Sequence, residues 1–169
     1  MDVTELRAQL DSLMKRYGAH PVTVSADAQL PFQAMWDVVD IIEKVGVERP
    51  GITAYRSKDT GTRSIGFLAR PPNENSEDLI SIMGHGNEYI LNGRLLALPA
   101  LDKILSRISS FSRNVTVIIV PANNQTVQQV VDILNICERE CLTKRHLLRR
   151  SQELPDLDDA QSDGRRLTQ

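Results

Sequence analysis

Apolar residues recur with the spacing of one helix face in four segments of the chain. In residues 4–17 they occupy positions i, i+4, i+7 and i+8, starting from Leu6. This spacing predicts an amphipathic helix. The same test predicts three more helices, and Pro31 suits the first turn of the second one. The predicted helices span residues 4–17, 31–46, 99–111 and 126–141.

Short runs of β-branched and aromatic residues between turn-forming residues predict the strands. The clearest run covers residues 115–120. Two other runs flank Gly84-His85-Gly86-Asn87, and this arrangement predicts a hairpin. These two runs are residues 79–83 and 89–91. Further strands are predicted at residues 21–26 and 52–55, with a less regular run at 64–69.

The order helix, strand, helix occurs twice along the chain, and a shift of 95 positions superposes the two occurrences without a gap. Leu6 then falls on Leu101 and Leu10 on Leu105. Any two such stretches align at some offset, but a single offset that holds both helices and the strand favours a duplication. We therefore predict an α+β fold of two duplicated small sheets, each covered on one face by two helices.

The predicted organisation has four parts. Residues 1–56 form a first unit, 57–77 a connecting segment with an extra strand, and 78–150 a second unit. Residues 151–169 form a polar tail with a composition typical of disorder. The first unit lacks the hairpin that precedes the second, and the second lacks the strand that follows the first. Sheet edges left open in this way are expected to accept a strand from a partner.

Composition narrows the classes of function. The chain of 169 residues is 41% hydrophobic and 4% aromatic, and its net charge is −2. Nucleic-acid binding is not expected, because it needs a basic excess or stacking aromatics. No run approaches the ~18 consecutive apolar residues of a membrane span, and the first residues lack a secretory signal pattern. Taken alone, the chain is expected to be soluble, whether it is complete or a piece of a longer anchored product.

Residues 24–40, VSADAQLPFQAMWDVVD, resemble the periplasmic domain of the ExbD/TolR family of biopolymer-transport proteins. That domain has a strand, an Ala-Asp turn, an aromatic residue and a helix that ends near glycine. Ala26-Asp27, Phe32, Val38-Val39 and Gly46 fit this pattern. Residues 88–93, followed by Leu98 and Leu101, are similar to the family's second strand and first helix. The resemblance covers residues 3–56 and 78–142.

The resemblance implies a non-enzymatic protein-interaction module, the soluble periplasmic part of a stator coupled to proton-motive force. Its partners would be energiser or proton-channel membrane proteins, or peptidoglycan, and a homo-oligomer is expected because the family's domain forms dimers. Family members carry an N-terminal transmembrane helix, so membrane attachment would need a segment absent from this chain. With that segment the protein would be periplasmic and anchored to the inner membrane; without it, cytoplasmic.

Several residues are candidates for partner binding, and most have a structural alternative. Asp27 can cap turn amides, and two aromatic residues four apart on one helix face can pack in the core instead of binding a partner. Asn92 precedes Gly93 in a turn signal that we place before the next helix. In the second unit Pro121-Ala122-Asn123-Asn124 replaces the Ala-Asp turn. The candidates are Asp27, Phe32, Trp36, Asn92, Asn123 and Asn124.

No catalytic, cofactor-binding or metal-binding residue is predicted. The hairpin turn accounts for His85, and Cys137 and Cys141, four apart on a helix, are expected to be packing residues. The basic run at 144–150 is expected to be a solvated helix end. The alternative function is a small α/β ligand-binding domain or enzyme with a pocket between the two units. It would need a converging set of titratable groups, which the sequence pattern does not supply.

Overall fold

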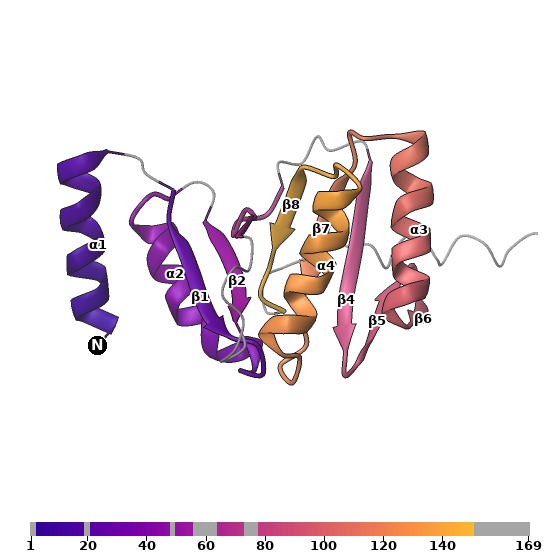
Figure 1. Cartoon of the computed structure of the whole chain (residues 1–169), viewed down its shortest axis with the longest axis horizontal. Helices are drawn as coiled ribbons and strands as arrows, with labels where there is room; N and C mark the ends of the chain where they lie inside the picture. Colours follow the sequence, from indigo (N-terminus) through magenta and orange to yellow (C-terminus); the bar gives the residue numbers. More distant parts are fainter. Residues whose placement is uncertain (1–2, 19–20, 48–49, 56–63, 73–77, 151–169) are drawn as a thin grey trace, which may run out of the picture.

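The computed structural model describes residues 3–18, 21–47, 50–55, 64–72 and 78–150. In these residues, four α-helices and two sheets form a mixed α+β fold (Figure 1), so the α+β part of the predicted fold class is confirmed. The predicted tail at 151–169 and much of the predicted connecting segment lie outside the described residues.

The first half of the molecule (residues 3–66) contains a three-stranded sheet in the order β1-β2-β3. β1 and β2 run parallel, and β3 is antiparallel to β2. The sequence predicted the two helices within a few residues, because their apolar faces are regular. The elements are α1 (Val3–Tyr17), β1 (Thr23–Asp27), the 3-10 helix η1 (Phe32–Met35), α2 (Trp36–Lys44), β2 (Gly51–Tyr55) and β3 (Ile65–Gly66).

The second half (residues 79–147) contains a five-stranded sheet in the order β6-β5-β4-β7-β8. The hairpin strand β4 runs parallel to β7, and β8 continues the parallel part on the other side. α3 follows β6 directly. The elements are β4 (Leu79–His85), β5 (Glu88–Leu91), β6 (Arg94–Leu96), α3 (Leu98–Phe111), β7 (Thr116–Val120), α4 (Val127–Arg139) and β8 (Lys144–Leu147).

The position of β8 shows that two expectations from the sequence were wrong. The basic run was expected to be a solvated helix end, and the second unit was expected to lack a strand after its second helix. Instead, residues 144–147 pair with β7 in the sheet. Arg145, which is buried, forms an ion pair with Glu138 of α4. A buried charge is tolerated when it is paired in this way, so a basic run can lie inside a sheet.

The two halves share a parallel strand-helix-strand arrangement with the same register. Thr23 of β1 pairs with Gly51, and Thr116 of β7 pairs with Lys144. In both cases the partner lies 28 positions further along the chain. One hydrophobic core joins the halves, since α4 packs against β1, β2 and β3.

Backbone hydrogen bonds also join the two sheets, in the region of the extra strand predicted at 64–69. Ile65 and Gly66 pair with β2. Two residues further on, the Leu68 N–H donates to the Arg145 carbonyl, and the Leu147 N–H donates to the Leu68 carbonyl, each at 2.8 Å. Residues 65–68 therefore contact β2, the central strand of the first sheet, and β8, the edge strand of the second.

Helix α4 ends in a strained position, which gives a first prediction. Cys141 has φ 57°. It occupies the left-handed position of a Schellman motif, in which the Leu142 N–H donates to the Cys137 carbonyl at 2.8 Å. Cys141→Gly is expected to raise the free energy of unfolding by about 1 kcal/mol, because glycine has no Cβ to strain there. Urea unfolding checks this, with Cys141→Ala as the control that keeps the strain; equal stabilities of the two variants would contradict the prediction.

Candidate functional site

The loops that follow β1 and β7 are paired with each other through their backbones. The Phe32 N–H donates to the Gln125 carbonyl at 2.7 Å, and the Val127 N–H donates to the Leu30 carbonyl at 2.8 Å. Pro31 and Thr126 lie opposite each other between these bonds, in an antiparallel bridge. The contact fixes the start of η1 against the start of α4.

Asp27 is exposed at the end of β1, and it caps the turn that leads into this contact. Its Oδ1 accepts a hydrogen bond from the Gln29 N–H at 2.8 Å, and its carbonyl accepts one from the Leu30 N–H at 3.1 Å. This is the turn-capping alternative that the sequence left open.

Phe32 and Trp36 lie in the core, with 0% and 4% of their surface exposed. Their rings meet edge to face, with centroids 5.3 Å apart. The Arg149 guanidinium lies 5.5 Å from the Trp36 ring centre and donates to Asp40 Oδ2 at 3.1 Å. In this structure the two aromatic side chains pack the core, as the packing alternative expected, and they are not on a partner-facing surface.

Asn123 and Asn124 are exposed after β7 and line a surface hollow of about 360 Å³. His85 and Arg150 line the same hollow. The hollow lies where the parallel strands β4 and β7 end, which is where ligands commonly bind in sheets of this kind. The structure thus brings together two of the predicted partner-binding residues and a histidine that the hairpin turn alone was expected to explain.

Below this hollow, a buried glutamine fixes the loop after β7 to the β4–β5 turn. Gln125 is 0% exposed. Its Oε1 accepts from the Ala122 N–H at 3.1 Å, and its Nε2 donates to the Glu88 carbonyl at 3.4 Å. The sequence analysis did not single out Gln125, because a lone glutamine in a loop carries no pattern.

Asn92 is separate from this group. It is exposed at φ 51° and, with Gly93, forms the turn between β5 and β6. The predicted turn is therefore present, but it leads into a strand and not directly into a helix. Asn92 follows the end of β5, whereas the turn at His85 and Gly86 precedes its start.

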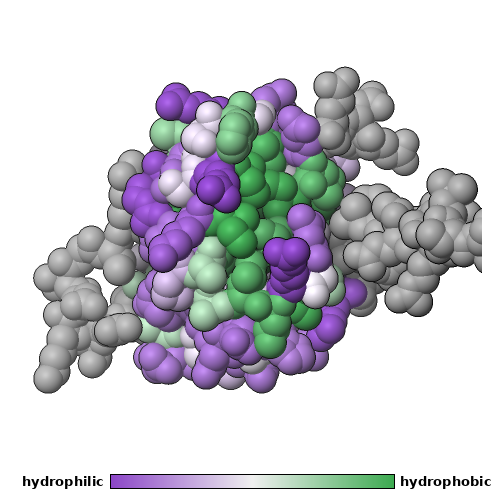
Figure 2. Space-filling model, turned by 90° about the vertical axis from the view of Figure 1, so that its right-hand side faces the viewer, coloured by the Kyte–Doolittle hydropathy of each residue, from purple (hydrophilic) through white to green (hydrophobic). Residues whose placement is uncertain are grey.

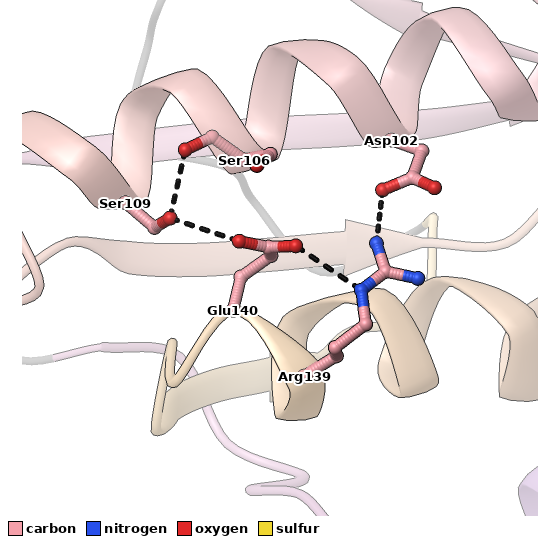
Figure 3. Close-up of polar contacts among 5 residues, drawn as sticks. All are labelled: Asp102, Ser106, Ser109, Arg139 and Glu140. Atoms are coloured by element: carbon pink, nitrogen blue, oxygen red, sulfur yellow. Dashed lines mark hydrogen bonds and ion pairs between the residues drawn. The ribbon is translucent and has the colours of Figure 1, made fainter.

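A polar network on the outside of the second half links α3 to the end of α4 (Figure 3). Glu140 accepts hydrogen bonds from Ser109 Oγ and from Arg139 Nε, each at 3.1 Å. The Arg139 guanidinium also forms an ion pair with Asp102. The hydrogen bond from Arg139 is the main cause that lowers the pKa of Glu140 below its usual value. This network holds the two helices together.

The end of the molecule that carries α3 has an apolar stripe surrounded by polar residues (Figure 2). Phe111 is 86% exposed there, and Leu95 is 51% exposed. A hollow of about 390 Å³ lies beside Phe111, with Leu79 and Ile80 of β4 and Ile108 in its lining. A hydrophobic surface of this kind is typical of an interaction site.

A second open surface lies at the other end of the molecule, where β1 is the edge strand of its sheet among the described residues. Thr23, Ser25 and Asp27 are exposed along it. Next to it, α1 contacts α2, and its apolar residues Leu6 and Leu10 are only partly buried.

Three further properties of the described residues bear on function: metal-binding groups, surface hollows and helices that could span a membrane. The part of the chain that the structure describes contains no group of three or more His, Cys, Asp or Glu side chains able to hold a metal ion. The hollows beside Lys15, beside His85 and beside Phe111 are each lined by residues of one half. None of the helices among the described residues is long and apolar enough to span a membrane.

Comparison with known proteins gives no assignment. No family model matches the chain, and no curated protein matches it either.

Proposed function

We propose that the chain is a non-enzymatic protein-interaction module of the ExbD/TolR kind, the soluble periplasmic part of a stator coupled to proton-motive force. In this proposal the two halves are duplicated units, paired within one chain as two subunits pair in a dimer. The proposal combines the resemblance at residues 24–40 with one structural observation, the bridge between Pro31 and Thr126.

The bridge supports a pair of equivalent units because of the positions that it joins. Pro31 and Thr126 are 95 positions apart, and this is the offset that superposes the two halves in sequence. The two hydrogen bonds beside the bridge correspond to each other under the same offset. The Phe32 N–H donates to the Gln125 carbonyl, and the Val127 N–H, 95 positions after Phe32, donates to the Leu30 carbonyl, 95 positions before Gln125. Pairing of a position with its own equivalent is what a local twofold axis produces.

The strand registers give further support. Both halves place the second parallel strand 28 positions after the first. The helices superpose at an offset of 95 but the strands at 93, so the single ungapped offset expected from the sequence is wrong for the strand. The loop between β7 and α4 is two residues longer than the loop between β1 and η1. The link from α4 to β8 is correspondingly shorter.

The test is a binding measurement against the partners that the resemblance implies. The purified chain is mixed with peptidoglycan sacculi, with the soluble domain of an energiser protein, and with a proton-channel subunit in detergent, the proteins taken from the same genome. We expect saturable binding to at least one of them. Absence of binding to all three would overturn the stator function.

Matched variants locate the binding surface. Asn123→Ala together with Asn124→Ala removes two exposed side chains beside the 360 Å³ hollow. We expect this pair to weaken binding about tenfold, which corresponds to about 1.4 kcal/mol. Ser110→Ala is the control, because its hydroxyl is exposed on α3 and donates to the Arg107 carbonyl of the same helix. A small molecule that binds in the hollow, with no protein or peptidoglycan partner, would instead favour the ligand-binding alternative.

A further inference from the structure

Two pairs of leucines at corresponding places in the halves differ in burial. Leu101 and Leu105 of α3 are both 0% exposed. Leu6 and Leu10 of α1, 95 positions earlier, are only partly buried. The difference follows from what lies beside each helix. α3 packs on α4 and on β5, whereas α1 packs on α2 and stands beyond β1, where the described part of the chain forms no hairpin (Figure 1).

The outer edge of β1, beside α1, also lacks a neighbour that the corresponding edge of β7 has. In the second half, the Thr116 N–H donates to the Asp78 carbonyl at 2.8 Å, so that β4 covers the outer edge of β7. In the first half, β1 is itself the edge strand within the described part of the chain. Among the described residues, no strand pairs with the outer edge of β1 as β4 pairs with β7.

The backbone groups at this edge can be named. The Gly51 N–H donates to the Val22 carbonyl at 2.8 Å, so Val22 points its backbone groups toward β2. Because these groups alternate in direction along a strand, those of Thr23 and Ser25 point away from β2. At the strand offset of 93, Thr23 corresponds to Thr116, whose N–H donates to the carbonyl of Asp78, the residue before β4.

We propose that the outer edge of β1, together with the apolar side of α1, is a docking site for one extended strand of a partner protein, which runs parallel to β1. The partner strand would alternate apolar and polar residues. Val24 and Ala26 of β1 belong to the core, whereas Thr23, Ser25 and Asp27 are exposed, so one face of the added strand meets apolar surface and the other meets water. Ile80 and Ile82 of β4 contribute to the core in this way beside β7.

A separate partner is favoured over a second copy of this chain. The hairpin that would fit the edge, β4 with β5, already covers β7 of its own half. A second copy could donate it only by uncovering its own β7, with no net gain in paired strands. This inference deepens the proposed function, because it names a surface and the chemistry of one partner.

The probe for this site is a synthetic peptide copied from β4, the strand that covers the corresponding edge in the second half. It has the sequence of residues 78–85 with Leu79→Thr and Met83→Thr, which makes its outer face polar. Hydrogen exchange of the whole protein is measured by NMR with and without the peptide. We expect at least tenfold slower exchange at the Thr23 and Ser25 amides, and little change at Val24 and Ala26, which already donate to β2. A peptide that also carries Ile80→Asp and Ile82→Asp should have no effect.

Variants of the protein make the test specific. Ser25→Pro removes an N–H that points away from β2, so it should abolish binding while the fold persists. Ser25→Ala keeps the N–H and should bind as the original chain does. If Ser25→Pro does not fold, Leu10→Asp on α1 decides the question, and it is expected to weaken binding at least tenfold.

Four outcomes would overturn the inference. The first is no effect of the peptide on the original chain. The second is equal binding of the peptide to the original chain and to a folded Ser25→Pro or Leu10→Asp variant. The third is protection elsewhere than at Thr23 and Ser25. The fourth is protection of these amides that rises with protein concentration without peptide, since a second copy would then occupy the edge. Failure of the peptide with intact binding to sacculi or energiser would leave the proposed function standing, and the reverse result would remove only the stator function.

Discussion

Replacing Gly84 by alanine is expected to lower the free energy of unfolding by about 3 kcal/mol. A Cβ at this position of β4 would overlap Gln125 Oε1 and lie 2.5 Å from the Ala122 backbone nitrogen. Gln125 cannot move aside cheaply, because it is buried and bonded to Ala122 and Glu88. The nitrogen is main chain, so relief there would require the loop after β7 to shift.

Urea unfolding of the Gly84→Ala variant measures this loss, and Gly66→Ala is the matched control. Gly66 also lies in a strand, but a Cβ there would meet nothing closer than the Pro50 carbonyl at 4.0 Å. The control is expected to change stability by less than about 0.5 kcal/mol. If the two variants lose the same stability, the close approach of Gln125 to β4 is not present in solution.

The second large effect is expected at α3. Leu105→Ala should cost about 3 kcal/mol, because Leu105 is 0% exposed and its loss leaves a cavity. Leu10→Ala, at the corresponding place in α1, should cost about 1 kcal/mol or less, since Leu10 is already partly exposed. Thermal or urea unfolding of both variants gives the comparison directly. Equal losses would contradict the difference in burial between the two helices.

The helices could be predicted from the sequence because their apolar faces are regular. The predicted helix at 99–111 compares with α3 at Leu98–Phe111, and 126–141 compares with α4 at Val127–Arg139. Most strands were predicted for a similar reason, since β-branched residues cluster in them. Local sequence therefore carried most of the secondary structure.

β8 could not be predicted in this way, because its residues are stabilised by partners far along the chain. Lys-Arg-His-Leu has no strand pattern. Arg145 pairs with Glu138, and His146 Nδ1 donates to the Arg70 carbonyl at 2.6 Å, 76 positions away. No local rule indicates that a carbonyl from so distant a segment will be available.

The candidate site was predicted in part. Asp27, Asn123 and Asn124 are on the surface, near the two paired loops, but Phe32 and Trp36 are inside. An aromatic pair four apart on a helix fits either place, and only the packing of Arg149 and the core around them decides. The hollow beside His85 forms because β4 and β7 end at the same edge of the sheet. The local sequence does not reveal which strands will be neighbours, so this hollow could not be predicted.

Residues 65–68 bind β2 on one side and β8 on the other, and this has a consequence for how the halves stay together. Two separate subunits associate in a second-order reaction, so dilution separates them. Here the segment that connects the halves is part of the contact between them. Association of the halves is therefore intramolecular, and the effective concentration of one half near the other is fixed. The pairing is thereby independent of how much protein the cell makes, and one gene delivers both halves in equal amount.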